Sequence, residues 1–230
     1  MNTTDENEYG DEGEEFRALL HSQRVWDVEL PSFDPTRAPD APLPLFHRWF
    51  AEAVAAGQPE PHTMTLATVD AEGRPDVRTL MLHDADARGW HFATHATSAK
   101  GRQLAVRPDA ALGFYWAAQG RQVRVRGTVT AAGAVESRAD LRARSTGALA
   151  AALTGHQSDV LSSAEELAVA SRAAWVRAEA EPDAPVPTWR RYALAPREVE
   201  FFQGDGARRH VRLRYRRDPD GGWVRELLWP

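Results

Sequence analysis

The 230-residue chain contains no cysteine, so disulfides, thiolate metal ligands and a cysteine nucleophile are excluded together. It has no apolar run approaching the ~18–20 residues that a membrane-spanning helix needs, so we expect a soluble protein with no membrane partner. The N-terminus has no positively charged stretch followed by an apolar one, which argues against export. A cytoplasmic location is the expectation that fits these absences.

Several general catalytic motifs are also absent. The chain has no phosphate-binding loop, no glycine-rich dinucleotide fingerprint, no paired-histidine zinc motif and no nucleophile elbow. His83, His91 and His95 are close in sequence, but they belong to two expected strands and a turn, so we expect no metal site. The net charge of −5 argues against general binding of nucleic acid. The arginine-rich segment 208–217 either is a solvated strand or faces a ligand, and both interpretations stay open.

The organisation of the chain follows from where its apolar residues lie. Residues 1–15 are polar and acidic and cannot offset their ordering entropy by burial, so we expect a disordered tail. The remainder, 16–230, is expected to form a single domain, because a hydrophobic fraction of 43% is enough for a core. It begins with an extended arm over 16–43 and a helix over 43–56 whose apolar side chains make one stripe.

Beyond residue 63 the pattern becomes that of short strands separated by turns. Few helices are expected among them, which indicates a mainly antiparallel barrel rather than alternating strand–helix units. The expected fold class is therefore mainly β (α+β), a β-barrel with flanking helices. The expected strands span 64–69, 76–82, 90–94, 110–116, 122–131, 189–194, 198–202, 210–216 and 223–228, and the helices span 99–106, 135–144, 148–153 and 163–180.

Two basic residues in the strand region are candidates for binding an anion. Arg78 lies mid-strand, where it either pairs with an acid such as Asp76 or binds phosphate oxygens through its planar guanidinium. Lys100 opens a helix just after Thr94 and Ser98, and helix amides, hydroxyls and a lysine together suit a dianionic phosphate. Three further polar residues are Gln122, Gln157 and Ser158. Their amide and hydroxyl groups either form hydrogen bonds to the edge of a heterocycle or are ordinary polar groups of loops.

Nine short motifs follow one another along the chain, and each of them is weak alone. They are Leu43–Phe50, Met64–Val69, Arg78–Leu82, Phe92–His95, Ser98–Arg102, Arg121–Arg124, Gln157–Ser158, Val199–Gly204 and Leu213–Arg216. In this order they are specific, and from about residue 40 to the C-terminus the chain resembles the pyridoxamine 5′-phosphate oxidase family.

The resemblance implies an FMN-binding split β-barrel with flanking helices, working as a homodimer with FMN at the subunit interface. Arg78 and Lys100, with help from Thr94, would hold the FMN phosphate. Ala99 stands where the family usually has arginine, which removes a contact worth ~1–3 kcal/mol, but FMN binding is expected to survive. The residues that would line or close the flavin site, some of them from the partner chain, are Thr79, Leu80, Met81, Leu82, Ala93, Gln122, Gln157, Ser158, Phe202 (where the family usually has tryptophan) and Arg212.

The substrate side departs further from the family pattern. Members that oxidise pyridoxine or pyridoxamine phosphate hold the substrate phosphate with a lysine, a tyrosine, an arginine and a serine. The matching positions here are His83, Asp140, Arg144 and Ala148, so only the arginine is kept. An aspartate beside a phosphate dianion repels it. Both members of the family's substrate-contacting pair near the C-terminus are kept, and they are the expected catalytic residues, Arg208 and His210.

A branch of the same family that oxidises late phenazine intermediates also lacks the lysine and often carries Thr-His-Ala, as residues 94–96 do here. We therefore expect an FMN-dependent oxidase of a small cyclic amine or reduced heterocycle in specialised metabolism, with O2 as electron acceptor. Its substrate-binding residues would be His83, Asp140, Arg144, Arg208 and His210. Two alternatives stay open: a pyridoxine/pyridoxamine 5′-phosphate oxidase making pyridoxal 5′-phosphate, and a flavin-binding dimer without turnover.

Overall fold

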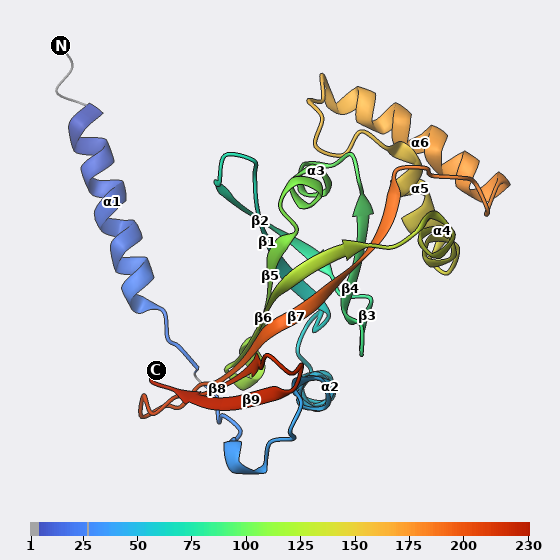
Figure 1. Cartoon of the computed structure of the whole chain (residues 1–230). Helices are drawn as coiled ribbons and strands as arrows, with labels where there is room; N and C mark the ends of the chain where they lie inside the picture. The colour runs from blue at the N-terminus through green and yellow to red at the C-terminus, as the bar shows by residue number, and fades with distance from the viewer. Residues whose placement is uncertain (1–4, 27) are drawn as a thin grey trace.

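The computed structural model describes residues 5–26 and 28–230, and its centre is one curled antiparallel sheet with helices around it (Figure 1). The order of strands is β2-β1-β5-β6-β7-β4-β3, and β8 and β9 extend the sheet from β7. The strands are β1 Thr63–Val69, β2 Pro75–Met81, β3 Asp84–Asp86, β4 Gly89–His95, β5 Asp109–Trp116, β6 Arg121–Ala131, β7 Trp189–Gln203, β8 Val211–Arg217 and β9 Trp223–Leu228. The expected antiparallel split barrel is confirmed.

The helices are α1 Asp5–Ser22, α2 Pro42–Ala55, α3 Ala99–Val106, α4 Ala134–Arg142, α5 Thr146–Thr154 and α6 Ala164–Ala180, with 3-10 turns at Pro35–Arg37 and Ala117–Gln119. Helix α2 packs on the apolar side of this sheet, and the other helices except α1 lie around it (Figure 1). The helix expected over 43–56 is α2, and its stripe is buried as the periodicity predicts. Phe46 packs edge-on against Trp90 of β4 and Phe114 of β5, and Trp49 meets Phe201 of β7. Each such buried ring contributes ~1.5–3 kcal/mol.

A smaller core holds α4, α5 and α6 together at one end of β7. Leu141 of α4, Leu149 of α5 and Ala178 of α6 are buried against one another, with Val186 and Trp189 packed beside them. This cluster matters for the site because it fixes α4, which carries Asp140, against the first residues of β7.

The last third of the sheet differs from the expectation in one respect. The two strands expected at 189–194 and 198–202 are a single strand, β7, which continues through Pro196. Proline lacks the N–H that a regular ladder needs, but β6 has a register shift between Arg126 and Gly127, so Gly127 faces Pro196 at the irregularity. Residues 84–86, expected in a turn, form the short edge strand β3.

Replacing Gly127 by alanine is expected to lower the free energy of unfolding by ~2–3 kcal/mol, because overpacking at a fixed backbone contact cannot relax. An added Cβ would lie 2.0 Å from the carbonyl oxygen of Ala195 on β7. The matched control is Gly133→Ala, where an added Cβ meets no atom within 4 Å. Urea denaturation of the two variants measures the difference, and equal midpoints would show that β6 and β7 can move apart at this point.

The N-terminus also differs from the expectation. Residues 1–4 of the expected disordered tail lie outside the described residues, while residues 5–15 belong to helix α1, which also takes the first part of the expected extended arm. The helix stands away from the barrel (Figure 1), and its apolar side chains Phe16, Leu19 and Leu20 are more than half exposed. The backbone hydrogen bonds of a helix form within the segment itself, so a helix can form there without burying apolar side chains. Disorder was expected because the segment has few such side chains to bury. The boundary between tail and domain stays a prediction.

No helix among the described residues is long and apolar enough to cross a bilayer.

Candidate functional site

Lys100, the single lysine of the chain, lies buried at the first turn of α3. Ser98 caps this helix by accepting a hydrogen bond from the Gly101 N–H at 3.2 Å. Gly101 is required there, because an added Cβ would lie 2.4 Å from the Ala96 carbonyl oxygen. Lys100 Nζ donates to Thr94 Oγ1 and to Gln157 Oε1, both at 3.2 Å. The expected pairing of Lys100 with Thr94 is therefore present.

The charge of Lys100 is not compensated by a contacting carboxylate among the described residues. The pKa of Lys100 is lowered to about 8, mainly by burial. Repulsion by Arg78 lowers this pKa as well, and its effect is larger than the opposite effect of Asp76. A buried ammonium beside a second cation, with only a hydroxyl and an amide as partners, is suited to receive an anion.

Arg78 projects from β2 toward α3. Its guanidinium donates to Asp76 Oδ2 at 2.5 Å, so the ordinary ion pair that the sequence allowed is present. It also donates to Thr68 Oγ1 at 2.5 Å and to Gln103 Oε1 at 3.0 Å. Gln103 was not anticipated as a site residue, although it lies three residues after Lys100 on the same helix. Asp76 is half exposed and shared between Arg78 and Gln103, so it offsets only part of the positive charge of Arg78.

The loop after α5 brings two more expected residues to this place. Gln157 Oε1 accepts a hydrogen bond from Thr94 Oγ1 at 2.9 Å, and Ser158 Oγ accepts one from the Ala99 N–H at 3.2 Å. Ser158 has a φ of +79°, so the chain turns sharply there over the start of α3. Together these residues form a basic cradle: Arg78, Thr94, Lys100, Gln157 and Ser158.

A second group of expected residues lies on the three neighbouring strands β6, β7 and β8. Gln122, Phe202 and Arg212 face one another in register. They line a cavity of about 230 Å³ together with Arg124, Glu200 and Pro230. The buried Glu200 accepts a hydrogen bond from Arg212 Nε at 2.8 Å and also pairs with Arg124, which neutralises much of the local positive charge.

These two groups lie at opposite ends of β7. Thr94 of the cradle pairs with Arg190, whereas Gln122 pairs with Phe202, twelve residues further along the same strand. At ~3.3 Å per residue the two points are roughly 35–40 Å apart along the strand. In Figure 1, α3 and the β8–β9 pair accordingly occupy opposite ends of the molecule. Within one chain, Thr94 and Phe202 therefore lie at opposite ends of β7, whereas Thr79, next to Arg78, and Gln122 border one groove.

The residues expected to line a flat ring alternate on the edge strand β2. Thr79 and Met81 are exposed, whereas Leu80 and Leu82 are partly buried against the core, so only the backbone of these two leucines is available. That the backbone and side chains of Thr79–Leu82 line a flat ring stays a prediction. Thr79 and Gln122 border one open groove of about 410 Å³ across β2, β1, β5 and β6. Ala93 is half-buried on β4.

Arg208 and His210, the expected catalytic pair, lie in the turn between β7 and β8. Asp205 organises this turn, since its carboxylate accepts the N–H groups of Ala207 and Arg209 at 2.8 and 3.2 Å. The Asp205 N–H donates to His210 Nδ1 at 3.1 Å, so a neutral His210 carries its proton on Nε2. The ring centroids of His210 and Phe202 are 5.2 Å apart, which places the pair beside the Gln122–Phe202–Arg212 group.

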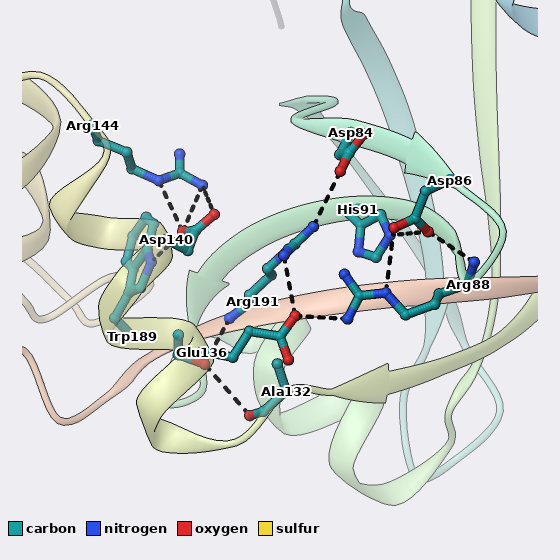
Figure 2. A network of polar contacts seen from close by, with 11 residues as sticks. Asp84, Asp86, Arg88, His91, Ala132, Glu136, Asp140, Arg144, Trp189 and Arg191 are labelled. Atoms are coloured by element: carbon teal, nitrogen blue, oxygen red, sulfur yellow. Dashed lines mark hydrogen bonds and ion pairs between the residues drawn. The ribbon is translucent and has the colours of Figure 1, made fainter.

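Three of the expected substrate residues are brought together near the start of β7. Arg144 donates to both carboxylate oxygens of Asp140 at 2.9–3.1 Å and to His83 Nε2 at 2.7 Å. Trp189 was not anticipated; its indole N–H donates to Asp140 at 3.0 Å, and the Arg144 guanidinium lies 5.0 Å from its ring centroid (Figure 2). Partial burial, and then the charge of Arg144, lower the pKa of His83, so this imidazole is neutral near pH 7.

Beside this cluster, a chain of ion pairs joins β3, β4, α4 and β7 (Figure 2). Arg191 binds Glu136 at 3.1 Å and Asp84 at 3.4 Å, and Arg88 binds the same Glu136 at 2.9 Å. Asp84, Asp86 and His91 bring atoms of metal-ligand type within 4.8 Å of one another. Burial raises the pKa of Asp86, but hydrogen bonds from His91 and Arg88 outweigh it and lower the pKa to about 2. Both carboxylates are thus engaged by protein cations, and we assign no metal to them.

Comparison with known proteins follows the same division of the chain. The family model described as "Pyridoxamine 5'-phosphate oxidase" matches residues 50–201, which contain the cradle and the His83–Asp140–Arg144 cluster. The model described as "Pyridoxine 5'-phosphate oxidase C-terminal dimerisation region" matches residues 189–230, which contain Phe202, Arg208, His210 and Arg212.

Curated relatives and solved structures agree with these matches. A pyridoxine/pyridoxamine 5′-phosphate oxidase of Pseudomonas fluorescens is 45% identical over 217 residues, 93% of this chain and 99% of the relative. One from Burkholderia orbicola is 42% identical over 201 residues, 86% of this chain and 94% of that relative. The crystal structure of PhzG from Burkholderia lata, in complex with tetrahydrophenazine-1-carboxylic acid, matches with a TM-score of 0.81 and 32% identity over 88% of this chain and all of that one.

The match to the family models covers most of the chain, and the fold, the order of the motifs and the basic cradle are consistent with it. The chain therefore belongs to the pyridoxamine 5′-phosphate oxidase family and is an oxidoreductase, an oxidase of that family.

Proposed function

We propose that this protein is an FMN-dependent homodimeric oxidase whose substrate is a small cyclic amine or reduced heterocycle without a phosphate group. The observation that carries the substrate assignment is the pairing of Asp140 with Arg144, which cancels the charge of the one cation kept from the family's phosphate set.

The residues of the basic cradle fit the phosphate of FMN. Lys100 is buried and contacts no carboxylate of the described residues, Arg78 lies close enough to lower its pKa, and Thr94 and the start of α3 add neutral donors. Ala99 supplies only its backbone N–H, so the cradle has one cation fewer than the family pattern implies.

The separation of the two groups along β7 supports a homodimer with the flavin between chains. The cradle of one chain and the Gln122–Phe202–Arg212 group of its partner would together surround one flavin, because Thr94 and Phe202 of one chain lie at opposite ends of β7. The outer strand β2 leaves Val77 and Met81 63% and 51% exposed, as expected for a strand that another chain covers. In this arrangement the partner's Arg208 and His210 complete the substrate site.

The charges around Arg144 favour a substrate that carries at most one negative charge. Asp140 binds Arg144 through both oxygens, and Trp189 fixes that aspartate by a further hydrogen bond. A phosphate dianion at this place would meet the Asp140 carboxylate and a neutral His83. A planar carboxylate, or a neutral amine, would be tolerated.

The overall reaction transfers two electrons and two protons from the substrate to dioxygen, which gives an oxidised ring or imine and hydrogen peroxide. Bound FMN would supply the hydride-accepting chemistry. The protein residues would orient the substrate: Arg208 provides a positive charge, and the His210 Nε2–H donates a hydrogen bond to the reacting ring or its substituent.

A second candidate is the oxidation of pyridoxine or pyridoxamine 5′-phosphate. It is favoured by the curated relatives of that name that are 42–45% identical over nearly their whole length. In that case the Arg144 guanidinium would have to leave Asp140 to bind the substrate phosphate.

Steady-state formation of hydrogen peroxide distinguishes the two candidates. The FMN-loaded enzyme would be assayed with tetrahydrophenazine-1-carboxylic acid and with pyridoxamine 5′-phosphate over the same concentration range. We expect the phosphate-free compound to have the larger kcat/KM. Efficient formation of pyridoxal 5′-phosphate would instead establish the second candidate.

The affinity for FMN is expected to fall as the pH rises above about 8. Burial and the neighbouring Arg78 lower the pKa of Lys100 to about 8, so its positive charge is present below that pH and lost above it. Fluorescence titration of the apoprotein with FMN from about pH 7 to pH 9 measures this. The control is Lys100→Arg, whose guanidinium stays charged over the range and should bind with little dependence on pH. A wild-type affinity that stays constant would show that the charge of Lys100 does not contribute.

A further inference from the structure

Trp26, on the segment between α1 and the domain, lies against the catalytic turn. Its indole meets the His210 ring edge-on, with centroids 5.2 Å apart and planes at 77°. It also lies 6.3 Å from the Phe202 ring, whose centroid is 5.2 Å from that of His210. Three rings from three separate segments thus pack against one another, at distances typical of favourable aromatic contacts.

Two glycines make room for this indole. A Cβ added to Gly204 would lie 2.9 Å from Trp26, and one added to Gly120 would lie 3.2 Å from its Nε1 and 2.9 Å from Leu30. Gly204 donates its N–H to the Gly120 carbonyl at 2.8 Å, so both glycines belong to one backbone contact. The indole therefore occupies a fitted depression on the domain rather than an open surface.

The chain adopts unfavourable features to hold Trp26 there. Trp26 has a φ of +53°, in the left-handed region that a bulky side chain rarely adopts, and its buried Nε1 has no hydrogen-bond partner among the residues that the structure describes. Arg208, in the catalytic turn, has a φ of +65°. Strained backbone of this kind gathers at functional sites, where the surroundings hold it in place.

We propose that Trp26 is a specificity-determining residue that selects planar ring substrates, an inference that rests on the proposed function. A flat ring placed against His210 would meet the indole of Trp26 on one side and Phe202 on another, while Arg208 pairs with a carboxylate on that ring. Trp26 contributes contact area and shape, and no proton or electron passes through it.

The test measures binding of phenazine-1-carboxylic acid, a flat ring with one carboxylate, to the FMN-loaded enzyme by the change in flavin absorption. Trp26→Ala and Trp26→Leu are expected to raise its Kd at least 10-fold, whereas Trp26→Phe, which keeps a ring, should raise it less than 3-fold. The control is Trp175→Ala on α6, where a half-exposed indole bonds only to the nearby Glu179. Flavin content and melting temperature should be the same in all four variants.

Each other outcome counts against the proposal. It is overturned if the leucine and alanine variants bind within 2-fold of wild type, if Trp26→Phe loses as much affinity as Trp26→Leu, or if the wild type does not bind the probe. Failure of the proposed function has a different signature. If the wild type turns over pyridoxamine 5′-phosphate efficiently, that function is wrong. The ring preference at Trp26 is still tested by the Kd values of the wild type and the Trp26 variants for phenazine-1-carboxylic acid.

Discussion

Replacing Lys100 by alanine is expected to weaken FMN binding by about 10- to 100-fold, since a hydrogen bond to a charged group contributes ~1.5–3 kcal/mol. Lys100 is buried, and among the described residues its hydrogen-bond partners are the hydroxyl of Thr94 and the amide of Gln157. In the proposed complex the ammonium would donate its remaining hydrogen bond to the FMN phosphate. Loss of Arg78 together with Lys100 should weaken binding further than either change alone, because both cations would contact the same dianion.

Isothermal titration of the apoprotein with FMN measures this effect. The matched control is Arg102→Ala, which removes an exposed cation two residues further along the same helix, where the guanidinium bonds to the Thr97 carbonyl. We expect that control to bind FMN within about 2-fold of wild type, as an exposed charge contributes little. Equal losses for Lys100→Ala and Arg102→Ala would mean that the helix carries only a general positive field and no phosphate site.

The triple substitution His83→Lys, Asp140→Tyr and Ala148→Ser is expected to raise kcat/KM for pyridoxamine 5′-phosphate by about 100-fold or more. These changes restore the residues that family members use for the substrate phosphate, and they release Arg144 from the carboxylate that now binds it. The three introduced side chains would each contribute ~1 kcal/mol by contacting the substrate phosphate, and the repulsion by Asp140 would be removed. Together these effects account for a gain of about 100-fold in kcat/KM.

The single variant Asp140→Asn separates the two contributions. It keeps the size of the side chain and a hydrogen-bond acceptor for the Trp189 indole, but it removes the charge that opposes a phosphate. We expect about a 10-fold gain from this change alone, corresponding to ~1.4 kcal/mol. If neither variant gains activity toward pyridoxamine 5′-phosphate, the cluster around Arg144 does not decide substrate choice.

Local patterns in the sequence were sufficient for most of the barrel. Apart from the two strands expected at 189–194 and 198–202, which are one strand, the elements expected between Leu43 and Leu228 are present because alternation and caps such as Ser98 act within a few residues. Around Pro196, by contrast, two strands were expected where there is one, because the cause is not local. The place of Pro196 in β7 depends on a register irregularity at Gly127, on another strand, which no local pattern reveals.

The site was predicted in part. The resemblance to the family led to Arg78, Thr94 and Lys100, and the structure brings them to one place with Gln157 and Ser158. It could not lead to Gln103, Trp189 or Trp26, since their importance comes from contacts made across the fold. Nor could it predict that Asp140 would bind Arg144 through both oxygens, because a four-residue spacing shows only that such a contact is possible.

The most direct test of the account is the rate at which the flavin of the FMN-loaded enzyme is bleached in a single turnover without oxygen. Tetrahydrophenazine-1-carboxylic acid and pyridoxamine 5′-phosphate would be compared at equal concentrations in a stopped-flow spectrometer. We expect the phosphate-free compound to bleach the flavin at least about 10-fold faster, which corresponds to a difference of ~1.4 kcal/mol between the two transition states. Bleaching that is as fast or faster with pyridoxamine 5′-phosphate would contradict this expectation.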